Sequence, residues 1–273
     1  MDVVVQISDP HFGTERPDVV EALVAFVHTQ APTLLVLSGD LTQRARTAQF
    51  DAAAAFVRRL GVPAVLAIPG NHDIPLYDLP GRLLRPYAGW RRAFGEELEP
   101  VHESDHLLAI AVKTTRRLRH VDGEVSEAQI ERVARRLERA HPNQLRLVVT
   151  HQPAFTVREE DAPDRLHNAE PALRRWAAAG ADIVLGGHIH LPYVVALHER
   201  LDGLARRMWA VQAGTAVSSR VRHEAGNSVN VLRWPWGPGP RRCTVERWDC
   251  ESAVRGFERA TQQRLELSAP PPA

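Results

Sequence analysis

Apolar residues in the first part of the chain follow two alternating patterns. Short runs of aliphatic and β-branched residues, typical of buried strands, are separated by longer segments in which apolar residues recur at helical spacing. The predicted strands are Val3–Ile7, Thr33–Leu37 and Ala64–Ile68, and the predicted helices between them are Asp18–Thr29 and Thr47–Leu60. This alternation is typical of βαβ units, so we expect a largely parallel sheet covered by helices.

The same pattern continues, with one interruption, to about residue 190. The interruption is Leu79–Phe94, a mixed stretch containing Pro86 that predicts a short irregular helical insertion. Ser126, with Gln129 three residues later, resembles a capping box and predicts a helix that ends near Ala140. The remaining predicted elements are strands at Leu107–Val112, Leu145–Val149 and Ile183–Leu185, and a helix at Ala169–Ala179.

The last third of the chain lacks helical spacing. It predicts antiparallel strands at Tyr193–Leu197, Arg207–Gln212, Val229–Trp234 and Thr244–Trp248. A chain that begins as βαβ units and ends in this way predicts an α/β fold, a four-layer α/β/β/α sandwich of two packed sheets flanked by helices. We expect one domain over residues 1–273. In it, residues 1–190 carry the site, residues 191–250 complete the second sheet, and residues 251–273 form a C-terminal tail.

The composition is that of an ordinary globular protein. Of the 273 residues, 44% are hydrophobic and 25% are charged, which argues against a disordered or fibrous chain. The 34 basic and 33 acidic residues give a net charge of +1, so bulk charge indicates neither nucleic acid nor an anionic membrane as a partner. No apolar run approaches the ~18 residues of a membrane span, and Cys243 and Cys250 fit a reduced compartment. We therefore expect a soluble, cytoplasmic protein.

Side chains that suit metal binding or acid–base chemistry follow five of the predicted strands. They are carboxylates, imidazoles and one amide, and glycines precede several of them, which allows close approach of the backbone. In chain order the clusters contain Asp9 and His11, then Asp40, then Asn71, His72 and Asp73, then His151, and finally His188 and His190. Because the carboxyl ends of the strands form the usual ligand crevice of an open α/β sheet, we expect these side chains to meet there.

The combination of clusters argues more strongly than any one of them. A lone Asp at a strand end, such as Asp9 or Asp40, is more often a turn or helix-cap residue, and a lone His such as His151 is more often structural. Those explanations are independent, and all would have to hold at five successive strand ends. Carboxylate and imidazole ligands with one bridging carboxylate suit two metal ions ~3.5–4 Å apart, so the sequence predicts a dinuclear metal site.

The ordered set of clusters resembles the calcineurin-like metallophosphoesterases, whose pattern is Asp-x-His, Gly-Asp, Gly-Asn-His-Asp/Glu, His and Gly-His-x-His. The resemblance covers about residues 3–190. The run Gly39–Gln43, with the later Gly214-Thr215-Ala216 and Asn227-Ser228, resembles the class III cyclic-nucleotide phosphodiesterase branch. The resemblance implies a metal-dependent phosphodiesterase that acts on a small phosphodiester, with 3′,5′-cyclic nucleotides as candidates.

The resemblance also implies a role for each residue of the clusters. One metal ion would be held by Asp9, His11, Asp40 and His190, and a second by Asp40, Asn71, His151 and His188, with Asp40 bridging. The expected metals are manganese or iron, with zinc as an alternative. A hydroxide bridging them would attack the phosphorus in line. His72 would protonate or stabilise the leaving oxygen, and Asp73 would orient the imidazole of His72.

One position departs from the family pattern. Gln152 stands where many members have a second His after the His151 position, and we expect this change to affect substrate preference rather than metal binding. Substrate choice itself depends on loops near His11, Arg44, Tyr77 and Tyr193, which carry no periodic pattern. The sequence therefore predicts the type of bond that is cleaved. It leaves open which substrate carries that bond and whether the protein forms a homo-oligomer.

Three other activities and one non-catalytic role remain open. A nuclease is expected to carry a basic stripe, for which Arg116, Arg117 and Arg119, and Arg220 with Arg222, are only short candidates. A lipid-head-group phosphodiesterase needs an apolar lid, and Leu79–Trp90 is the one candidate. A nucleotide pyrophosphatase is the third enzyme alternative. A non-catalytic protein-interaction scaffold usually loses metal ligands, whereas all the ligand positions are kept here.

Overall fold

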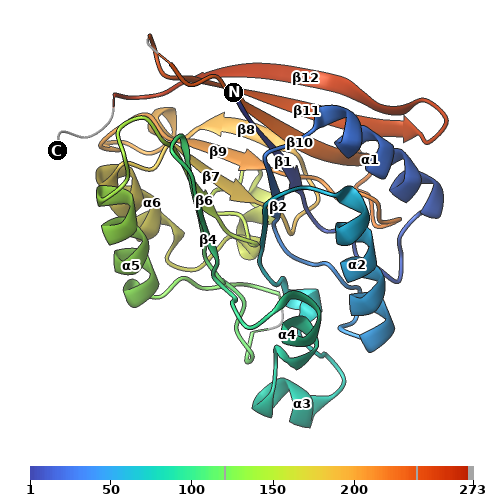
Figure 1. Ribbon diagram of the computed structural model, residues 1–273. Helices are drawn as coiled ribbons and strands as arrows, with labels where there is room; N and C mark the ends of the chain where they lie inside the picture. Colours follow the sequence, from blue (N-terminus) through green and yellow to red (C-terminus); the bar gives the residue numbers. More distant parts are fainter. Residues whose placement is uncertain (120, 238, 270–273) are drawn as a thin grey trace.

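A computed structural model describes residues 1–119, 121–237 and 239–269 of the chain. Two six-stranded mixed sheets pack face to face, and helices cover the outer faces (Figure 1). The expected α/β fold, a four-layer α/β/β/α sandwich, is therefore confirmed.

The first sheet is parallel on one side of β1 and antiparallel on the other. In spatial order its strands are β12 (Gly256–Glu266), β11 (Arg242–Ser252), β10 (Asn227–Trp234), β1 (Asp2–Ile7), β2 (Leu34–Leu37) and β3 (Val65–Ala67). The pairs β1–β2 and β2–β3 are parallel, whereas β10 runs antiparallel to β1. The carboxyl ends of β1, β2 and β3 consequently lie at one edge of the sheet.

The second sheet has a parallel centre and antiparallel edges. In spatial order its strands are β4 (Val101–Glu103), β5 (Leu107–Ala111), β6 (Leu145–Val149), β7 (Ile183–Gly186), β9 (Trp209–Gln212) and β8 (Tyr193–Ala196). Strands β5, β6, β7 and β9 are parallel neighbours, and β4 and β8 pair antiparallel at the two edges. The carboxyl ends of β6 and β7 therefore also meet at one edge.

The helices form where the sequence places start and stop signals. The longer helices are α1 (Pro17–Gln30), α2 (Thr47–Leu60), α5 (Glu127–Glu138) and α6 (Ala169–Ala179). Helix α2 ends at Gly61, which has a left-handed conformation, and Ser126 caps α5 by accepting a hydrogen bond from the amide of Gln129, as predicted. The predicted insertion contains α3 (Leu79–Leu84) and α4 (Ala88–Phe94), and three short 3-10 turns are η1 (Asn71–Asp73), η2 (Glu159–Asp164) and η3 (Leu197–Glu199).

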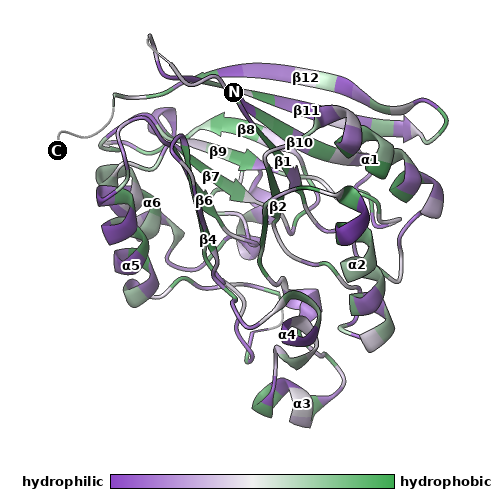
Figure 2. Ribbon diagram, in the orientation of Figure 1, coloured by the Kyte–Doolittle hydropathy of each residue, from purple (hydrophilic) through white to green (hydrophobic). Residues whose placement is uncertain are grey.

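Three apolar clusters separate the layers. The cluster between the two sheets includes Val4, Leu34, Leu147 and Leu232, all fully buried. Two others fill the space beneath the helices on the outer faces, with α1 and α2 over the first sheet and α5 and α6 over the second. The inner strands are correspondingly apolar along most of their length, whereas β12 is largely hydrophilic (Figure 2). None of the helices in the described residues has both the length and the apolar content that a membrane-spanning helix requires.

The strands after residue 191 are divided between the sheets, so the expectation that residues 191–250 all complete the second sheet is wrong. Strands β8 and β9 belong to the second sheet, and β9 is parallel to β7 rather than part of an antiparallel meander. Strands β10 and β11 belong to the first sheet instead. Strand β10 is buried along nearly its whole length, because it lies between β1 and β11 in the middle of that sheet.

The expectation that residues 251–273 form a C-terminal tail is also wrong for most of this segment. It contains β12, which pairs antiparallel with β11, and residues 270–273 lie outside the described part of the chain. Seven successive residues of this strand, Glu258–Arg264, are exposed. Because neither face of that stretch is buried, its sequence has no alternation of apolar and polar residues, and only pairing with β11 makes it a strand.

Candidate dinuclear metal site

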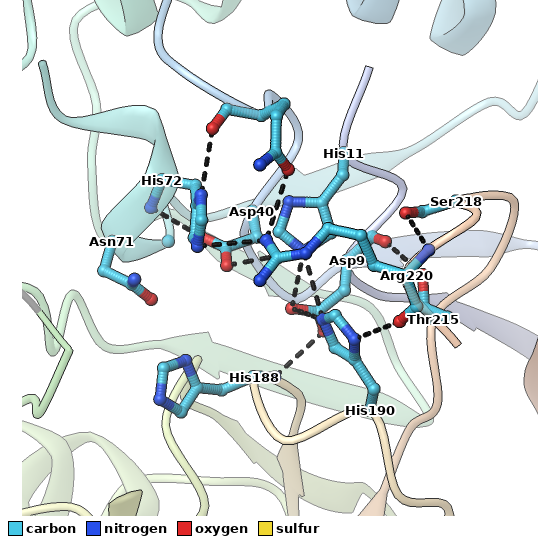
Figure 3. A network of polar contacts seen from close by, with 12 residues as sticks. Asp9, His11, Asp40, Asn71, His72, His188, His190, Thr215, Ser218 and Arg220 are labelled. Carbon is cyan, nitrogen blue, oxygen red and sulfur yellow. Dashed lines mark hydrogen bonds and ion pairs between the residues drawn. The ribbon is translucent and has the colours of Figure 1, made fainter. Parts of the chain in front are cut away.

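The clusters predicted from the sequence converge at the carboxyl ends of strands from both sheets (Figure 3). Asp9 and His11 follow β1, Asp40 follows β2, and Asn71 begins the 3-10 turn η1 after β3. From the second sheet, His151 follows β6, and His188 and His190 follow β7. Because the two sheets pack face to face, these loops meet across the sandwich, although the residues are up to about 180 positions apart in the chain.

The backbone at these positions has an unusual conformation. Five of the seven proposed ligands have positive φ angles: Asp9 at 51°, His11 at 45°, Asp40 at 52°, His188 at 73° and His190 at 56°. Residues other than glycine adopt this left-handed conformation rarely, and it persists where the surrounding structure enforces it, often at functional sites. The chain therefore turns sharply after β1, β2 and β7, at the positions that carry these five side chains.

Two glycines allow the loops to approach one another closely. A Cβ atom on Gly39, whose φ angle is +100°, would lie 2.3 Å from Nδ1 of His151. A Cβ atom on Gly70 would lie 2.1 Å from Oδ1 of Asp40. The glycines that precede Asp40 and Asn71 in the sequence are thus required by the packing of the cluster, independently of any chemistry they take part in.

Asp9, His11 and His190 form the first of two donor groups. Nε2 of His190 lies 3.4 Å from Oδ1 of Asp9 and 3.1 Å from Nε2 of His11. Nε2 of His11 is 3.8 Å from the same Asp9 oxygen. Asp9 and His11 are fully buried, so these atoms face one another rather than solvent.

Asp40, Asn71, His151 and His188 form the second donor group. Nε2 of His151 lies 3.0 Å from Oδ1 of Asn71 and 3.4 Å from Oδ1 of Asp40. His188 has a ligand atom within 4.8 Å of those of Asp40 and His151. Asp40 belongs to both groups, because its other oxygen, Oδ2, lies 3.7 Å from Nε2 of His11.

Neighbouring groups hold the imidazoles in orientations that direct one nitrogen into the cluster. Nδ1 of His151 is 2.8 Å from the carbonyl oxygen of Ser38, and Nδ1 of His190 is 2.6 Å from the carbonyl oxygen of Arg220. A carbonyl oxygen only accepts hydrogen bonds, so each of these nitrogens carries the proton and Nε2 is left as the donor atom for a metal. Nε2 of His188 instead faces Asp164 at 3.6 Å, which leaves Nδ1 of that ring for the cluster.

In the cluster, neighbouring charges and burial shift the pKa values of the carboxyl groups in opposite directions. Burial raises the pKa of Asp9 and Asp40, but His190 beside Asp9 and His151 beside Asp40 outweigh it and hold both pKa values well below their usual range. Burial lowers the pKa of His11 to about 3, although Asp40 and Asp9 act against it. Both carboxylates are therefore ionised and His11 is neutral near pH 7, which are the forms that bind metal ions.

Three buried polar atoms of the proposed ligands have no hydrogen-bond partner among the described residues. They are Oδ1 of Asp9 and Nδ1 of His11 in the first donor group, and Nδ1 of His188 in the second. An unpaired buried polar atom is costly, so such atoms are rare unless a further ligand satisfies them. Together with two carboxylates, four imidazoles and one amide oxygen, this fits a pair of cations that accept nitrogen and oxygen ligands.

The side chain of His72 also reaches the cluster. Its Nδ1 lies 2.9 Å from the carbonyl oxygen of Gln43, and its Nε2 lies 3.1 Å from Nη1 of Arg220. Its amide donates to Oδ1 of Asp40 at 2.8 Å. The imidazole is therefore oriented by a backbone carbonyl and stands beside the proposed bridging carboxylate.

Asp73 does not contact the imidazole of His72, so the expectation that it orients this ring is wrong. Its carboxylate accepts hydrogen bonds from the amides of Leu41 (3.1 Å), Thr42 (2.8 Å) and Gly70 (2.9 Å), and from the hydroxyl of Thr42 (2.9 Å). These donors belong to the loops after β2 and β3. Asp73 therefore ties the Asp40 loop to the Asn71 turn, which is a structural role.

The runs that resemble class III phosphodiesterases hold the Asp9 loop in place. The hydroxyl of Thr215 donates to the carbonyl of Asp9 at 2.6 Å, and the amide of Ala216 donates to the carbonyl of Ser8 at 3.0 Å. The side-chain amide of Asn227 donates to the carbonyl of Ser218 at 2.8 Å. The contacts of Thr215 and Ala216 join the segment after β9 to the loop that carries Asp9, and the contact of Asn227 joins that segment to the start of β10.

Several residues that line the site were not placed there by the sequence. Asp164, Arg220 and Arg222 line the same pocket as the metal-ligand clusters, together with Val121. The pocket has a volume of about 290 Å³. The hydroxyl of Tyr193, expected near the substrate, donates instead to the carbonyl of Phe155, and Tyr193 does not line this pocket.

The two-sheet fold and the paired Asp/His groups agree with the family that the sequence resembles. The chain belongs to the calcineurin-like phosphoesterase family, whose model matches residues 3–192. It is also 30% identical, over 180 residues, to a protein of Synechococcus sp. named a probable cyclic nucleotide phosphodiesterase. That alignment covers 60% of this chain and 60% of the relative, so the chain matches only about three fifths of the relative's length.

Solved structures share the fold at low sequence identity. A dimetal phosphatase from Danio rerio matches with a TM-score of 0.67 at 12% identity, covering 98% of this chain and 99% of that one. The purple acid phosphatase PPD1 from yellow lupin matches with a TM-score of 0.71 at 12% identity, covering 97% of this chain and 53% of that one. Vps29 from Chaetomium thermophilum matches with a TM-score of 0.52 at 12% identity, covering 99% and 98%.

Proposed function

We propose that this protein is a phosphodiesterase that hydrolyses a small phosphodiester with the help of two metal ions. The observation that carries the proposal is the position of Asp40, whose two carboxylate oxygens face different donor groups, His11 on one side and His151 on the other. A carboxylate in this position suits a bridge between two cations. The membership of the chain in the calcineurin-like phosphoesterase family supports the same reaction type.

The donor groups suggest how the cations would be shared. Asp9, His11, Asp40 and His190 would hold one, and Asp40, Asn71, His151 and His188 the other. The ligand types suit manganese and iron, and also zinc. When bound, the two cations would lower the pKa of a water molecule and neutralise charge on the phosphoryl oxygens.

His72 would act on the leaving group. Its Nδ1 donates to the carbonyl oxygen of Gln43, which leaves Nε2 directed toward the pocket. From this position Nε2 can stabilise or, when protonated, protonate the leaving oxygen of the ester. No protein nucleophile is needed for this reaction.

The similarity to a probable cyclic nucleotide phosphodiesterase makes 3′,5′-cyclic nucleotides the first substrates to test. A nuclease, a nucleotide pyrophosphatase and a lipid-head-group phosphodiesterase are the alternatives within the family. Two of the arginines considered for a basic stripe are paired with carboxylates, Arg119 with Asp122 at 2.7 Å and Arg116 with Glu124 at 3.9 Å. This pairing lowers the positive charge available to a polynucleotide and favours a small substrate.

A substrate panel with measured metal content tests the proposal. Purified protein, loaded with manganese, iron or zinc, would be assayed with bis(p-nitrophenyl) phosphate, cyclic nucleotides, dinucleotides, phospholipid head-group diesters and single-stranded DNA. We expect hydrolysis of the model diester that stops when a chelator removes the metal. A protein that binds two metals yet hydrolyses no ester on the panel would instead support the non-catalytic scaffold role.

A further inference from the structure

The guanidinium of Arg220 stands at the mouth of the metal pocket and points toward His72 (Figure 3). Its Nη1 lies 3.1 Å from Nε2 of His72 and 3.2 Å from Oε1 of Gln43. We propose that Arg220 binds an anionic, non-bridging oxygen of the substrate's phosphoryl group and so selects for charged phosphate esters. This inference rests on the proposed phosphodiesterase function and adds a substrate-binding residue to it.

The charge of Arg220 is not neutralised within the described part of the chain. No carboxylate there lies within 4.0 Å of it, and its two side-chain partners are a neutral amide oxygen and an imidazole nitrogen. Arg222, two residues away, differs, since it pairs with Glu160 at 3.1 Å and Asp161 at 2.7 Å. Of the two arginines that line the pocket, Arg222 thus forms ion pairs within the protein, whereas Arg220 is available to bind an anion.

Hydrogen bonds hold the backbone around Arg220 in one position. The amide of Arg220 donates to the hydroxyl of Ser218 at 2.9 Å, and the hydroxyls of Ser218 and Thr14 are 3.1 Å apart. The amide of Ser219 also donates to the carbonyl of Thr14 at 2.9 Å. These hydrogen bonds connect the segment that carries Arg220 to the loop that follows His11. They therefore fix the position of the backbone from which the guanidinium extends.

A phosphoryl oxygen would be a stronger hydrogen-bond acceptor for Arg220 than its present partners, Gln43 and His72. Hydrogen bonds from a guanidinium to an anionic oxygen are about twice as strong as those to neutral acceptors, and the planar group can donate two in parallel. An incoming phosphoryl oxygen would replace Gln43 and His72 as the acceptor, leaving Nε2 of His72 free to face the leaving group. This exchange would not disturb His190, because Nδ1 of His190 donates to the backbone carbonyl oxygen of Arg220, at 2.6 Å, and not to its side chain.

The experiment compares Arg220→Gln and Arg220→Lys with the wild type on esters of different charge. The substrates are p-nitrophenyl phosphate, bis(p-nitrophenyl) phosphate and the neutral triester diethyl p-nitrophenyl phosphate. We expect Arg220→Gln to lower kcat/KM about 10- to 100-fold for the two anionic esters and less than about 3-fold for the triester. Arg220→Lys should fall between wild type and Arg220→Gln, because it keeps the charge but loses the paired donors.

The matched control is Arg158→Gln, which removes the same charge from an exposed residue that pairs with Glu160 and Glu224 and does not line the pocket. It should leave kcat/KM for all three esters near the wild-type value. Metal content, measured on every variant, should stay the same. An equal loss for the triester and the anionic esters, an equal loss in Arg158→Gln, or loss of metal in Arg220→Gln would each overturn the inference.

A second readout does not depend on turnover. Binding of inorganic phosphate, measured by calorimetry with the metal-loaded and the metal-free protein, should weaken about 10- to 100-fold in Arg220→Gln but not in Arg158→Gln. Unchanged phosphate affinity in Arg220→Gln would overturn the inference. If wild-type protein hydrolyses no ester, the proposed function fails, and the phosphate measurement still decides the role of Arg220.

Discussion

The most unusual feature of individual residues is that five proposed ligands adopt left-handed backbone conformations. For Asp and His this costs free energy that must be recovered elsewhere in the structure. Here the contacts that recover it are visible: the carboxylate of Asp73 holds the loop of Asp40, and the hydroxyl of Thr215 holds the loop of Asp9. Residues outside the proposed ligand set therefore hold the loops that carry the proposed ligands.

The two proposed roles at residue scale can be separated by mutation. Asp40→Ala should abolish activity and metal binding, because Asp40 faces both donor groups. His72→Ala should leave the metal content unchanged and lower kcat by about 10²–10⁴-fold, the usual effect of losing a general acid or base. Metal analysis and kinetics on the same preparations test this, and equal metal loss in both variants would contradict the division of roles.

The protonation of His151 predicts how metal affinity depends on pH. Burial lowers the pKa of His151, but the charge of Asp40 prevails and raises it to about 9. Without metal, this ring therefore stabilises the fold as a cation below pH ~6.5, and that contribution is lost as the pH rises through about 9. Because a metal binds the neutral ring, binding at pH 8 should release a proton.

Calorimetric titration of manganese in two buffers with different ionisation enthalpies measures that proton release. The apparent affinity should rise from pH 7 to about pH 9, where the ring is neutral without help from the metal. His11, whose pKa is lowered to about 3, should release no proton in this range. Binding heats that are identical in both buffers at pH 8 would show that His151 is already neutral.

At the scale of elements, β12 is the strand that its own sequence identifies least. It belongs to the first sheet through pairing with β11, and it contributes Leu265, fully buried, to the core between the sheets. The rest of the strand, Glu258–Arg264, is exposed. An element that looks like a polar tail therefore closes one edge of the central core.

Leu265→Ala should consequently lower the free energy of unfolding by ~2–5 kcal/mol, the usual range for removing a buried leucine side chain. The matched control is Gln263→Ala in the exposed part of the same strand, which should change it by less than ~0.5 kcal/mol. Urea unfolding followed by fluorescence and circular dichroism measures both. Equal, small changes in the two variants would mean that this strand does not pack on the core.

At the scale of the whole molecule, the site joins the two sheets. Asp9, His11, Asp40 and Asn71 come from the first sheet, and His151, His188 and His190 come from the second. Metal ions held between these groups would act as links across the sandwich, and ligands that bind only the folded state stabilise it by mass action. Stability and activity are therefore expected to share the same metal dependence.

Each metal ion contributes ~2.7 kcal/mol at a concentration 100-fold above its dissociation constant, so removal of both should lower the melting temperature by roughly 10–20 °C. Differential scanning calorimetry with and without chelator measures the shift. One cooperative transition is expected in both cases if residues 1–273 form a single domain, which stays a prediction. Asp40→Ala should show no metal-dependent shift, and two separate transitions would contradict the single domain.

Much of the fold and the ligand set could be predicted from the sequence because each leaves a local trace. The strand ending at Ile7, the helix capped by Ser126 and the glycine at residue 61 all follow from short-range spacing and capping rules. The function of Asp73 could not be predicted in this way. Its four hydrogen-bond donors come from residues 41, 42 and 70, and adjacency to His72 in the chain does not imply contact with its ring.

The sequence by itself predicted the layered α/β fold and brought out the seven proposed metal-ligand positions, because apolar periodicity and strand-end clusters occur in consecutive residues. Only the tertiary structure decided which sheet β10, β11 and β12 join, since the pairing of a strand depends on partners far away in the chain. It also decided that Arg220, from a loop without periodic signal, faces His72 across a separation of 148 residues. Such a juxtaposition arises from the packing of two sheets, and no short stretch of sequence records it.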